Sequence, residues 1–234
     1  MKITVISIAW NKYELTKEFL RRLRDNTDIP FQLVFVDNGS EEPISKLVKE
    51  YFPHSDLITY KKNIGLPATR NPSMKKAIGD IVFWLDNDTY VERGWYKAML
   101  AEFDNPKVGI VGPEGRRIKN PFIYKNFNPW EFPGTFAPNP YVDWLVGYAI
   151  ALRREAYMPV PDWKLMVTFD DIDVCLGVKA NGYQAKMLFN PVPLRHLGSQ
   201  TATPVRPTKK TEIELFPRWW EYWKKYRSCF MNYE

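Results

Sequence analysis

The feature that most constrains the fold is a run of five apolar residues, Ile81 to Leu85, that ends in the polar turn Asp86-Asn87-Asp88. A strand that is buried on both faces, as in a parallel sheet, is apolar along its whole length. In α/β sheets, ligands bind at the carboxyl ends of the strands, which is where Asp86 and Asp88 would lie. Two carboxylates there form a hard oxygen site for Mg2+ or Mn2+, and such an ion usually also binds phosphate oxygens. Taken alone, the Asp-x-Asp pattern also fits two ordinary turn residues.

The first ninety residues alternate between apolar strands and amphipathic helices. The expected strands cover residues 3–8, 31–36, 57–60 and 81–85. Asn11 and Ser40 are each expected to cap the helix that follows, because their side chains accept hydrogen bonds from free backbone N–H groups. Alternating strands and helices predict an α/β fold with a doubly wound, mostly parallel sheet flanked by helices.

The second half of the chain has a less regular pattern. Further strands are expected at 108–111, 143–152 and 184–188, and a helix is expected from Asp170 to the stop signal Asn181-Gly182. Residues 113–143 are rich in proline, asparagine and aromatic residues without a clear period, and a loop of that length is usually functional or mobile. A last helix is expected to open at Phe216, with Pro217 in its first turn and an aromatic face.

Composition excludes several classes of protein. A hydrophobic content of 45% and a charged content of 26% are ordinary for a soluble globular protein. No apolar run approaches the roughly 20 residues that span a bilayer, and the start of the chain lacks the features of a signal peptide. Two cysteines make no disulfide framework, which favours a cytoplasmic location, and two histidines exclude a histidine-rich metal centre.

The basic charge is concentrated near the C-terminus. The net charge is +6, and the stretch from Arg206 to Arg227 holds seven lysines and arginines against three glutamates. Either this surface meets an anionic partner or it is a solvated basic face. The aromatic face of the last helix is expected to pack on the chain's own domain, to form a homodimer, or to contact the inner face of a membrane peripherally.

Polar residues follow several of the expected strands, and their order resembles that of the GT-A fold glycosyltransferases of family 2. The segments that carry the resemblance are Ser7 to Asn11, Val36 to Ser40, Asn63 to Gly65 with Arg70-Asn71, Asp86 to Asp88, Phe169 to Leu176, and His196. The resemblance implies a Rossmann-like nucleotide-sugar-binding half (1–112) and an irregular acceptor-binding half (113–205). Together they would form a GT-A domain (1–205), followed by a basic aromatic tail (206–234).

The resemblance also implies roles for individual residues on the donor side. Asp37 would hold the nucleotide base, Arg70 the base or a phosphate, and Asp86 a ribose hydroxyl or a metal-bound water. Asp88 and His196 would be the ligands of Mn2+ or Mg2+. The remaining donor-binding candidates are Ala9, Asn11, Asn63 and Asn87.

On the acceptor side, Asp171 occupies the position of the catalytic base, with Asp170 beside it. The base would take a proton from the acceptor hydroxyl as that oxygen attacks the anomeric carbon, which gives inversion. The implied acceptor-binding residues are Trp130, Trp144, Gly147 and Asp173. The family usually has glutamate where Asp170 stands, and the segment before the acidic pair lacks the usual glycine.

The resemblance therefore implies an inverting, hexosyltransferase-like enzyme that uses a nucleotide-diphosphate sugar, with a UDP-sugar as the first expectation, and a glycan or other hydroxyl acceptor. Three alternatives are kept. A sugar-nucleotide pyrophosphorylase is disfavoured because Ala9-Trp10-Asn11-Lys12 lacks the glycines of a phosphate loop. A non-catalytic module that binds polysaccharide or nucleic acid would also suit a basic, aromatic chain. The third is a glycosyltransferase that acts on a nucleic acid or another polyanion.

Overall fold

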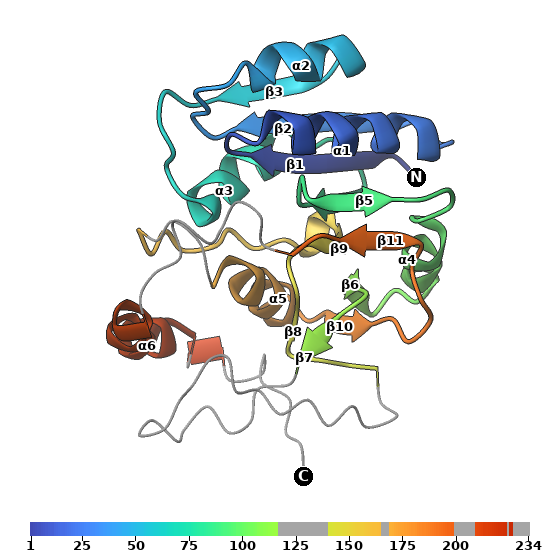
Figure 1. Ribbon diagram of the computed structural model, residues 1–234. Helices are drawn as coiled ribbons and strands as arrows, with labels where there is room; N and C mark the ends of the chain where they lie inside the picture. Colours follow the sequence, from blue (N-terminus) through green and yellow to red (C-terminus); the bar gives the residue numbers. More distant parts are fainter. Residues whose placement is uncertain (117–139, 165–168, 199–208, 224, 227–234) are drawn as a thin grey trace.

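A seven-stranded sheet with helices on both faces forms the centre of the molecule (Figure 1). A computed structural model of the chain describes residues 1–116, 140–164, 169–198, 209–223 and 225–226. The strands are β1 (Ile3–Ala9), β2 (Gln32–Asp37), β3 (Asp56–Thr59), β4 (Ile81–Leu85), β6 (Val108–Gly112), β9 (Ala149–Arg153) and β10 (Gln184–Met187).

The sheet is mostly parallel, which confirms the fold class expected from the sequence. Its strand order is β10-β6-β9-β4-β1-β2-β3. Strands β4, β1, β2 and β3 are parallel to one another, and β6 is parallel to β10. Strand β9 lies between β4 and β6 and is antiparallel to both. The carboxyl ends of β1, β2 and β4 therefore meet at one edge.

The helices divide into two layers, each with its own core. On one face, α1 (Tyr13–Asn26), α2 (Ile44–Tyr51) and α4 (Lys97–Ala101) pack against the sheet around Phe19, Phe83 and Trp95. On the other face, α3 (Leu66–Lys76) and α5 (Asp170–Ala180) share a core with α6 (Lys209–Trp223). Short 3-10 turns cover Glu102–Asp104 and Arg154–Ala156.

Two small antiparallel sheets complete the described fold. In one, β5 (Thr89–Val91) pairs with β11 (Leu194–His196), and in the other, β7 (Gly115–Arg116) pairs with β8 (Trp144–Leu145). The sequence did not predict β5, β7 or β11, because strands of two or three residues have too few positions to show a period. The single strand expected over 143–152 is in fact β8 and β9, separated by residues 146–148.

The expected helix caps were wrong. The residue before α1 is Lys12, in the left-handed region at φ 61°, and no side chain caps this helix. Asn11 instead ties two loops together: its Oδ1 accepts a hydrogen bond from the Glu41 N–H at 2.8 Å, and its own N–H donates to Ser40 Oγ at 2.8 Å. The side chains of Asn11 and Ser40 are therefore used between the loops that follow β1 and β2, not at helix starts.

The C-terminal helix packs on the chain's own domain. It begins at Lys209, so Pro217 lies inside it rather than in its first turn. Leu215, Trp219 and Trp223 are buried in the same core as α5. Of the three expected partners for the aromatic face, the chain itself is the one that these residues contact. Among the described helices, none combines the length and the apolar character that a bilayer-spanning helix requires.

Candidate active site

The turn that follows β4 is held in place by Tyr148, the last residue of the segment between β8 and β9. The backbone carbonyl of Tyr148 accepts hydrogen bonds from the Asp86 N–H at 2.9 Å and from Thr89 Oγ1 at 3.1 Å. The Thr89 N–H closes the turn by donating to the Asp86 carbonyl at 3.0 Å. The carboxylates of Asp86 and Asp88 are thus presented by a turn with fixed ends.

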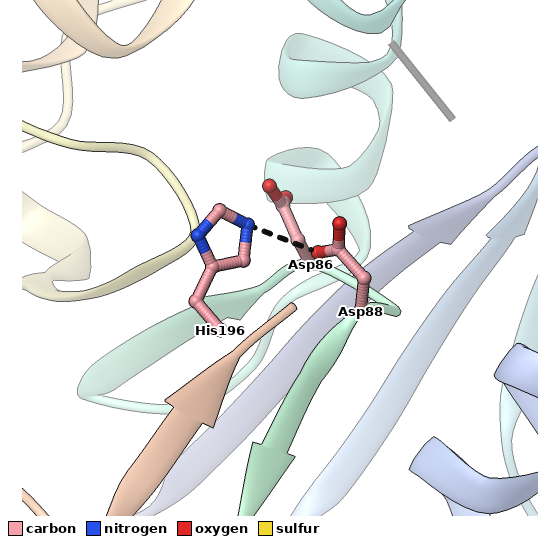
Figure 2. A group of neighbouring side chains, drawn as sticks. All are labelled: Asp86, Asp88 and His196. Carbon is pink, nitrogen blue, oxygen red and sulfur yellow. Dashed lines mark ion pairs between the residues drawn. The ribbon is translucent and has the colours of Figure 1, made fainter. Parts of the chain in front are cut away.

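Asp86, Asp88 and His196 converge at this edge of the sheet (Figure 2). The pairing of β11 with β5 places His196 opposite Thr89, and the Leu197 N–H donates to the Asp88 carbonyl at 3.0 Å. Each of the three side chains offers one ligand atom, and these atoms all lie within 4.8 Å of one another. His196 Nε2 is 3.3 Å from Asp88 Oδ1.

The electrostatics of this cluster favour a bound cation. Burial raises the pKa of Asp86 to about 7, and the charge of Asp88 adds to this, while Arg70 opposes it. Burial lowers the pKa of His196, but its hydrogen bond to Asp88 and the charges of Asp88 and Asp86 outweigh burial, so the net shift is upward. Two carboxylate oxygens and an imidazole nitrogen fit Mn2+ well, and they fit Mg2+ less well, since Mg2+ prefers oxygen ligands alone.

Tyr148 also supports the cluster through its ring, a contact that no pattern in the sequence predicted. Its ring stacks on the His196 ring with 4.4 Å between centroids and 7° between planes. The preceding residue, Gly147, donates its N–H to Asp171 Oδ2 at 3.2 Å. Residues 147 and 148 therefore connect the Asp86–Asp88–His196 cluster to Asp171.

The acidic pair at the start of α5 is divided between two environments. Asp170 is 4% exposed, and its Oδ2 accepts hydrogen bonds from Arg70 Nε at 2.8 Å and Nη2 at 2.7 Å. Asp171 is partly exposed, and its contacts are with the backbone N–H groups of Gly147 and Ile172. Burial raises the pKa of Asp171 to about 7, and the charge of Asp170 adds to this. Asp171 is thus the member of the pair that is available to take a proton.

Gly147 packs closely against the acidic pair. A Cβ at this position would lie 3.2 Å from the Asp171 Cβ and 3.6 Å from both Asp171 Oδ2 and Arg70 Nη2. The first contact is tight, so a side chain here would push Asp171 by a few tenths of an ångström, while the other two would be ordinary van der Waals contacts. The structure brings Gly147 to the acidic pair, near the acceptor side on which the resemblance placed it.

Arg70 has a different contact from the one that the resemblance implied. Its side chain is 2% exposed, it is ion-paired with Asp170, and its guanidinium lies 4.7 Å from the centre of the Trp84 ring. A contact with a base or phosphate would require this buried pair to open or a further N–H to be used. Its role in donor binding stays a prediction.

The remaining donor-side residues lie at the ends of β1 and β2, in the loop after β3 and in the turn after β4. Asp37 accepts from the Ser40 N–H at 3.0 Å and from Ser45 Oγ at 2.9 Å, so both of its oxygens already hold the local loop. Asn63 Oδ1 accepts from Asn38 Nδ2 at 3.0 Å. Ala9 is buried at the end of β1, and its carbonyl accepts from the Asn38 N–H.

This loop junction depends on Gly39. Its φ is +79°, and a Cβ there would lie 2.2 Å from the Lys62 carbonyl carbon and 2.5 Å from the Asn63 nitrogen. Only glycine allows the two loops to approach so closely. Asn87, by contrast, is directed into the core, where its Nδ2 donates to Thr16 Oγ1 at 3.0 Å. The described contact of Asn87 therefore supports the turn.

The acceptor-side candidates are only partly placed. Trp130 lies outside the described residues, as does most of the 113–143 segment. Trp144 is buried in β8. Asp173 is 1% exposed, and its two oxygens accept hydrogen bonds from three indole N–H groups. Its described contacts hold helix α6, and the acceptor contact that the resemblance implied stays a prediction.

Comparisons with known proteins find similar sequences among glycosyltransferases and in an O-antigen biosynthesis protein. The sequence is similar to the "Uncharacterized glycosyltransferase YwdF" of Bacillus subtilis, with 27% identity over 44% of this chain and 39% of that protein. It is also similar to the "O-antigen biosynthesis protein RfbC" of Myxococcus xanthus, with 23% identity over 77% of this chain and 16% of that protein. The chain thus spans well under half the length of these relatives.

Among solved structures, the fold is similar to that of S. aureus TarS 1-349 in complex with UDP-GlcNAc. The TM-score is 0.60 at 19% identity, over 83% of this chain and 58% of that one. It is also similar to the mannosyltransferase PcManGT from Pyrobaculum calidifontis in complex with GDP-Man and Mn2+. Here the TM-score is 0.63 at 18% identity, over 97% of this chain and 72% of that one. At these identities the likeness establishes the GT-A fold.

The family comparison covers most of the described site. The sequence pattern of Glycosyl transferase family 2 matches residues 4–159, which include the turn after β4 and the segment with Gly147 and Tyr148. With the GT-A fold and this match together, the chain belongs to glycosyl transferase family 2.

Proposed function

We propose that this protein transfers a sugar from a nucleoside diphosphate sugar to an acceptor hydroxyl, with inversion at the anomeric carbon and a divalent cation in the site. The observation that carries the proposal is the juxtaposition of the Asp86–Asp88–His196 cluster with Asp171 through Gly147 and Tyr148. The Asp86–Asp88–His196 cluster suits a cation with its bound diphosphate, and Asp171 suits a proton transfer.

Asp88 and His196 are the proposed metal ligands, and Asp86 either completes the set or holds a bound water or a ribose hydroxyl. When bound, Mn2+ or Mg2+ would stabilise the negative charge of the leaving diphosphate. The nucleotide is proposed to bind at the loops after β1, β2 and β3. Asn11 and Ser40 fix the first two loops to each other, and Asn63 fixes the third to the second.

Asp171 is the proposed general base. Its pKa of about 7 lets it remain ionised near neutral pH and still accept a proton from an attacking hydroxyl. The Gly147 N–H holds Oδ2, which fixes the direction of the carboxylate. Asp170 has a structural role in this proposal. It neutralises the buried Arg70, so the Asp171 carboxylate is not needed for that ion pair.

The donor is proposed to be a UDP-sugar first and a GDP-sugar second. Both classes occur in structures of similar fold, UDP-GlcNAc with TarS and GDP-Man with PcManGT. The proposed acceptor is a glycan or another hydroxyl compound.

The test is nucleotide release from UDP-glucose, UDP-GlcNAc and GDP-mannose in the presence of Mn2+, with water or added sugars as acceptors. We expect slow release of UDP from one UDP-sugar by the wild-type protein and loss of that release in Asp171→Asn. Tight nucleotide-sugar binding with no release from any of the three donors would contradict the proposal and support a non-catalytic binding module.

A further inference from the structure

The carboxylate of Asp173, buried between α5 and α6, is bound by three tryptophans. Oδ1 accepts hydrogen bonds from Trp219 Nε1 at 2.8 Å and Trp223 Nε1 at 2.6 Å, and Oδ2 accepts from Trp163 Nε1 at 2.6 Å. Trp219 and Trp223 come from α6, and Trp163 comes from the segment before α5. A buried carboxylate is costly unless its oxygens are satisfied, so these three donors must be kept together.

The same helix also holds the residue on the other side of the acidic pair. The Phe169 ring packs against the Trp219 ring, with centroids 5.7 Å apart. Phe169 has φ 66°, in the left-handed region that residues other than glycine rarely adopt. Such a conformation persists when its surroundings hold it in place. The Phe169 carbonyl also accepts the Asp173 N–H at 2.8 Å, which closes the first turn of α5.

Asp170 and Asp171 therefore lie between two residues that α6 fixes, Phe169 before them and Asp173 after them. This turn faces the site, because Asp171 accepts the Gly147 N–H and Asp170 pairs with Arg70. A loss of either α6 contact would let the turn move. The cluster of Asp86, Asp88 and His196, which lies in the turn between β4 and β5 and at the end of β11, would stay in place.

We propose that α6 is a positioning element of the transfer reaction, with Asp173, Trp219 and Trp223 setting the position of Asp171 from outside the site. The inference rests on the proposed function, since Asp171 is the base there. None of the three residues needs to touch the substrate. A small displacement of a catalytic group is enough to slow a reaction strongly, so α6 governs turnover and has little influence on nucleotide binding.

The test compares the double variant Trp219→Phe/Trp223→Phe with Trp95→Phe. The double variant keeps an aromatic ring at each position, although phenyl is smaller than indole, and it removes the two N–H donors from α6. Trp95 is the control for the loss of ring volume and of an indole N–H. Its buried ring packs in the core on the other face of the sheet, and its Nε1 donates a part-buried hydrogen bond to Thr27 Oγ1 at 3.0 Å. Two quantities are measured: amide hydrogen exchange at Ile172 to Cys175, and kcat and KM for nucleotide release from the UDP-sugar that the wild type uses.

In the double variant we expect exchange at these amides to rise about tenfold, as local opening becomes easier. We also expect kcat to fall about 10- to 100-fold with KM for the donor changed less than about twofold, because a misplaced base slows the chemical step alone. Trp95→Phe should leave the exchange at these amides and kcat near wild-type values. If the double variant does not fold, Trp223→Phe alone is read in the same way.

Exchange at Ile172 to Cys175 no faster in the double variant than in Trp95→Phe would overturn the inference, as would a fall in kcat of equal size in both. Asp171→Asn separates this failure from failure of the proposed function. If Asp171→Asn keeps wild-type turnover, the base is assigned wrongly, and the exchange comparison still decides whether α6 holds this turn.

Discussion

Adjacent residues of like chemistry have separate tasks in this site. Asp170 and Asp171 follow each other in sequence, yet one is enclosed with Arg70 and the other reaches the Gly147 N–H. The sequence predicted an acidic pair at the start of a helix, which the structure confirms. The resemblance assigned the base to Asp171, but the sequence showed no physical reason for a difference between the two, because that difference depends on Arg70 and Gly147, 100 and 24 residues away in the chain.

Asp170→Asn should therefore lower mainly the stability of the protein, and Asp171→Asn should lower mainly its activity. Asp170→Asn leaves a buried guanidinium without its counter-charge, so the free energy of unfolding should fall by about 3–5 kcal/mol. Asp171→Asn should change stability by less than about 1 kcal/mol, and it should lower nucleotide release by about 100- to 10,000-fold because an amide takes no proton. Urea unfolding and initial rates measure the two quantities. Full activity in Asp171→Asn, with loss of activity at unchanged stability in Asp170→Asn, would reverse the assignment.

The pH dependence of kcat should report Asp171. Its folded pKa is raised to about 7 by burial and by the charge of Asp170, and only the deprotonated carboxylate can act as a base. At saturating Mn2+ and donor, kcat should fall by about tenfold per pH unit below about pH 7 and be level above it. The residual rate of Asp171→Asn serves as the control and should lack this limb. An acid limb centred near the ordinary pKa of an aspartate, about 4, would contradict the account.

At the scale of elements, the segment between β8 and β9 is the part of the site that the sequence described least well. A continuous strand was expected over 143–152 because most of the residues after Asp143 are apolar, and apolar runs do not reveal where a strand breaks. The break allows Gly147 to approach Asp171, and it allows Tyr148 to hold the turn after β4 by its carbonyl and His196 by its ring. The contacts of this segment are with residues that are distant in sequence, Asp171 and His196 among them.

Tyr148→Leu should weaken the metal site without removing a ligand. The substitution removes the ring that stacks on His196 and keeps the backbone carbonyl that holds Asp86 and Thr89. Loss of a group that orients a metal ligand typically lowers metal affinity about 10- to 100-fold, and we expect a change near the lower end. Tyr148→Phe keeps the stacked ring and is the control. Calorimetric titration of Mn2+ in the presence of UDP measures the affinity. Equal affinities for Tyr148→Leu and Tyr148→Phe would show that the stack does not orient His196.

At the scale of the whole molecule, the amino-terminal half was the predictable part. Its strands alternate with helices, and a parallel sheet built that way brings strand ends to one edge. That rule was sufficient to gather the loops after β1, β2 and β4. It did not predict the antiparallel β9 in the middle of the sheet or the small β5–β11 sheet, although His196 reaches Asp88 through the latter. Pairings between strands that are distant in the chain leave no local pattern in the sequence.

The C-terminal helix α6 was also predictable only in part. Its aromatic face predicted burial, which the structure confirms for Trp219 and Trp223. That their indole N–H groups would meet at Asp173 could not be predicted, because the partner lies on a different helix.

The central claim is that the cluster of Asp86, Asp88 and His196 binds a divalent cation together with a nucleoside diphosphate. Calorimetric titration of UDP, with GDP for comparison, into wild-type protein and into Asp88→Asn tests it most directly, each with Mn2+ and with EDTA. The account predicts that the wild type binds one of the two nucleotides with Mn2+, that EDTA weakens this binding by at least about tenfold, and that Asp88→Asn binds weakly in both conditions. Equal affinity of the wild type with Mn2+ and with EDTA, or undiminished Mn2+-dependent binding by Asp88→Asn, would contradict it.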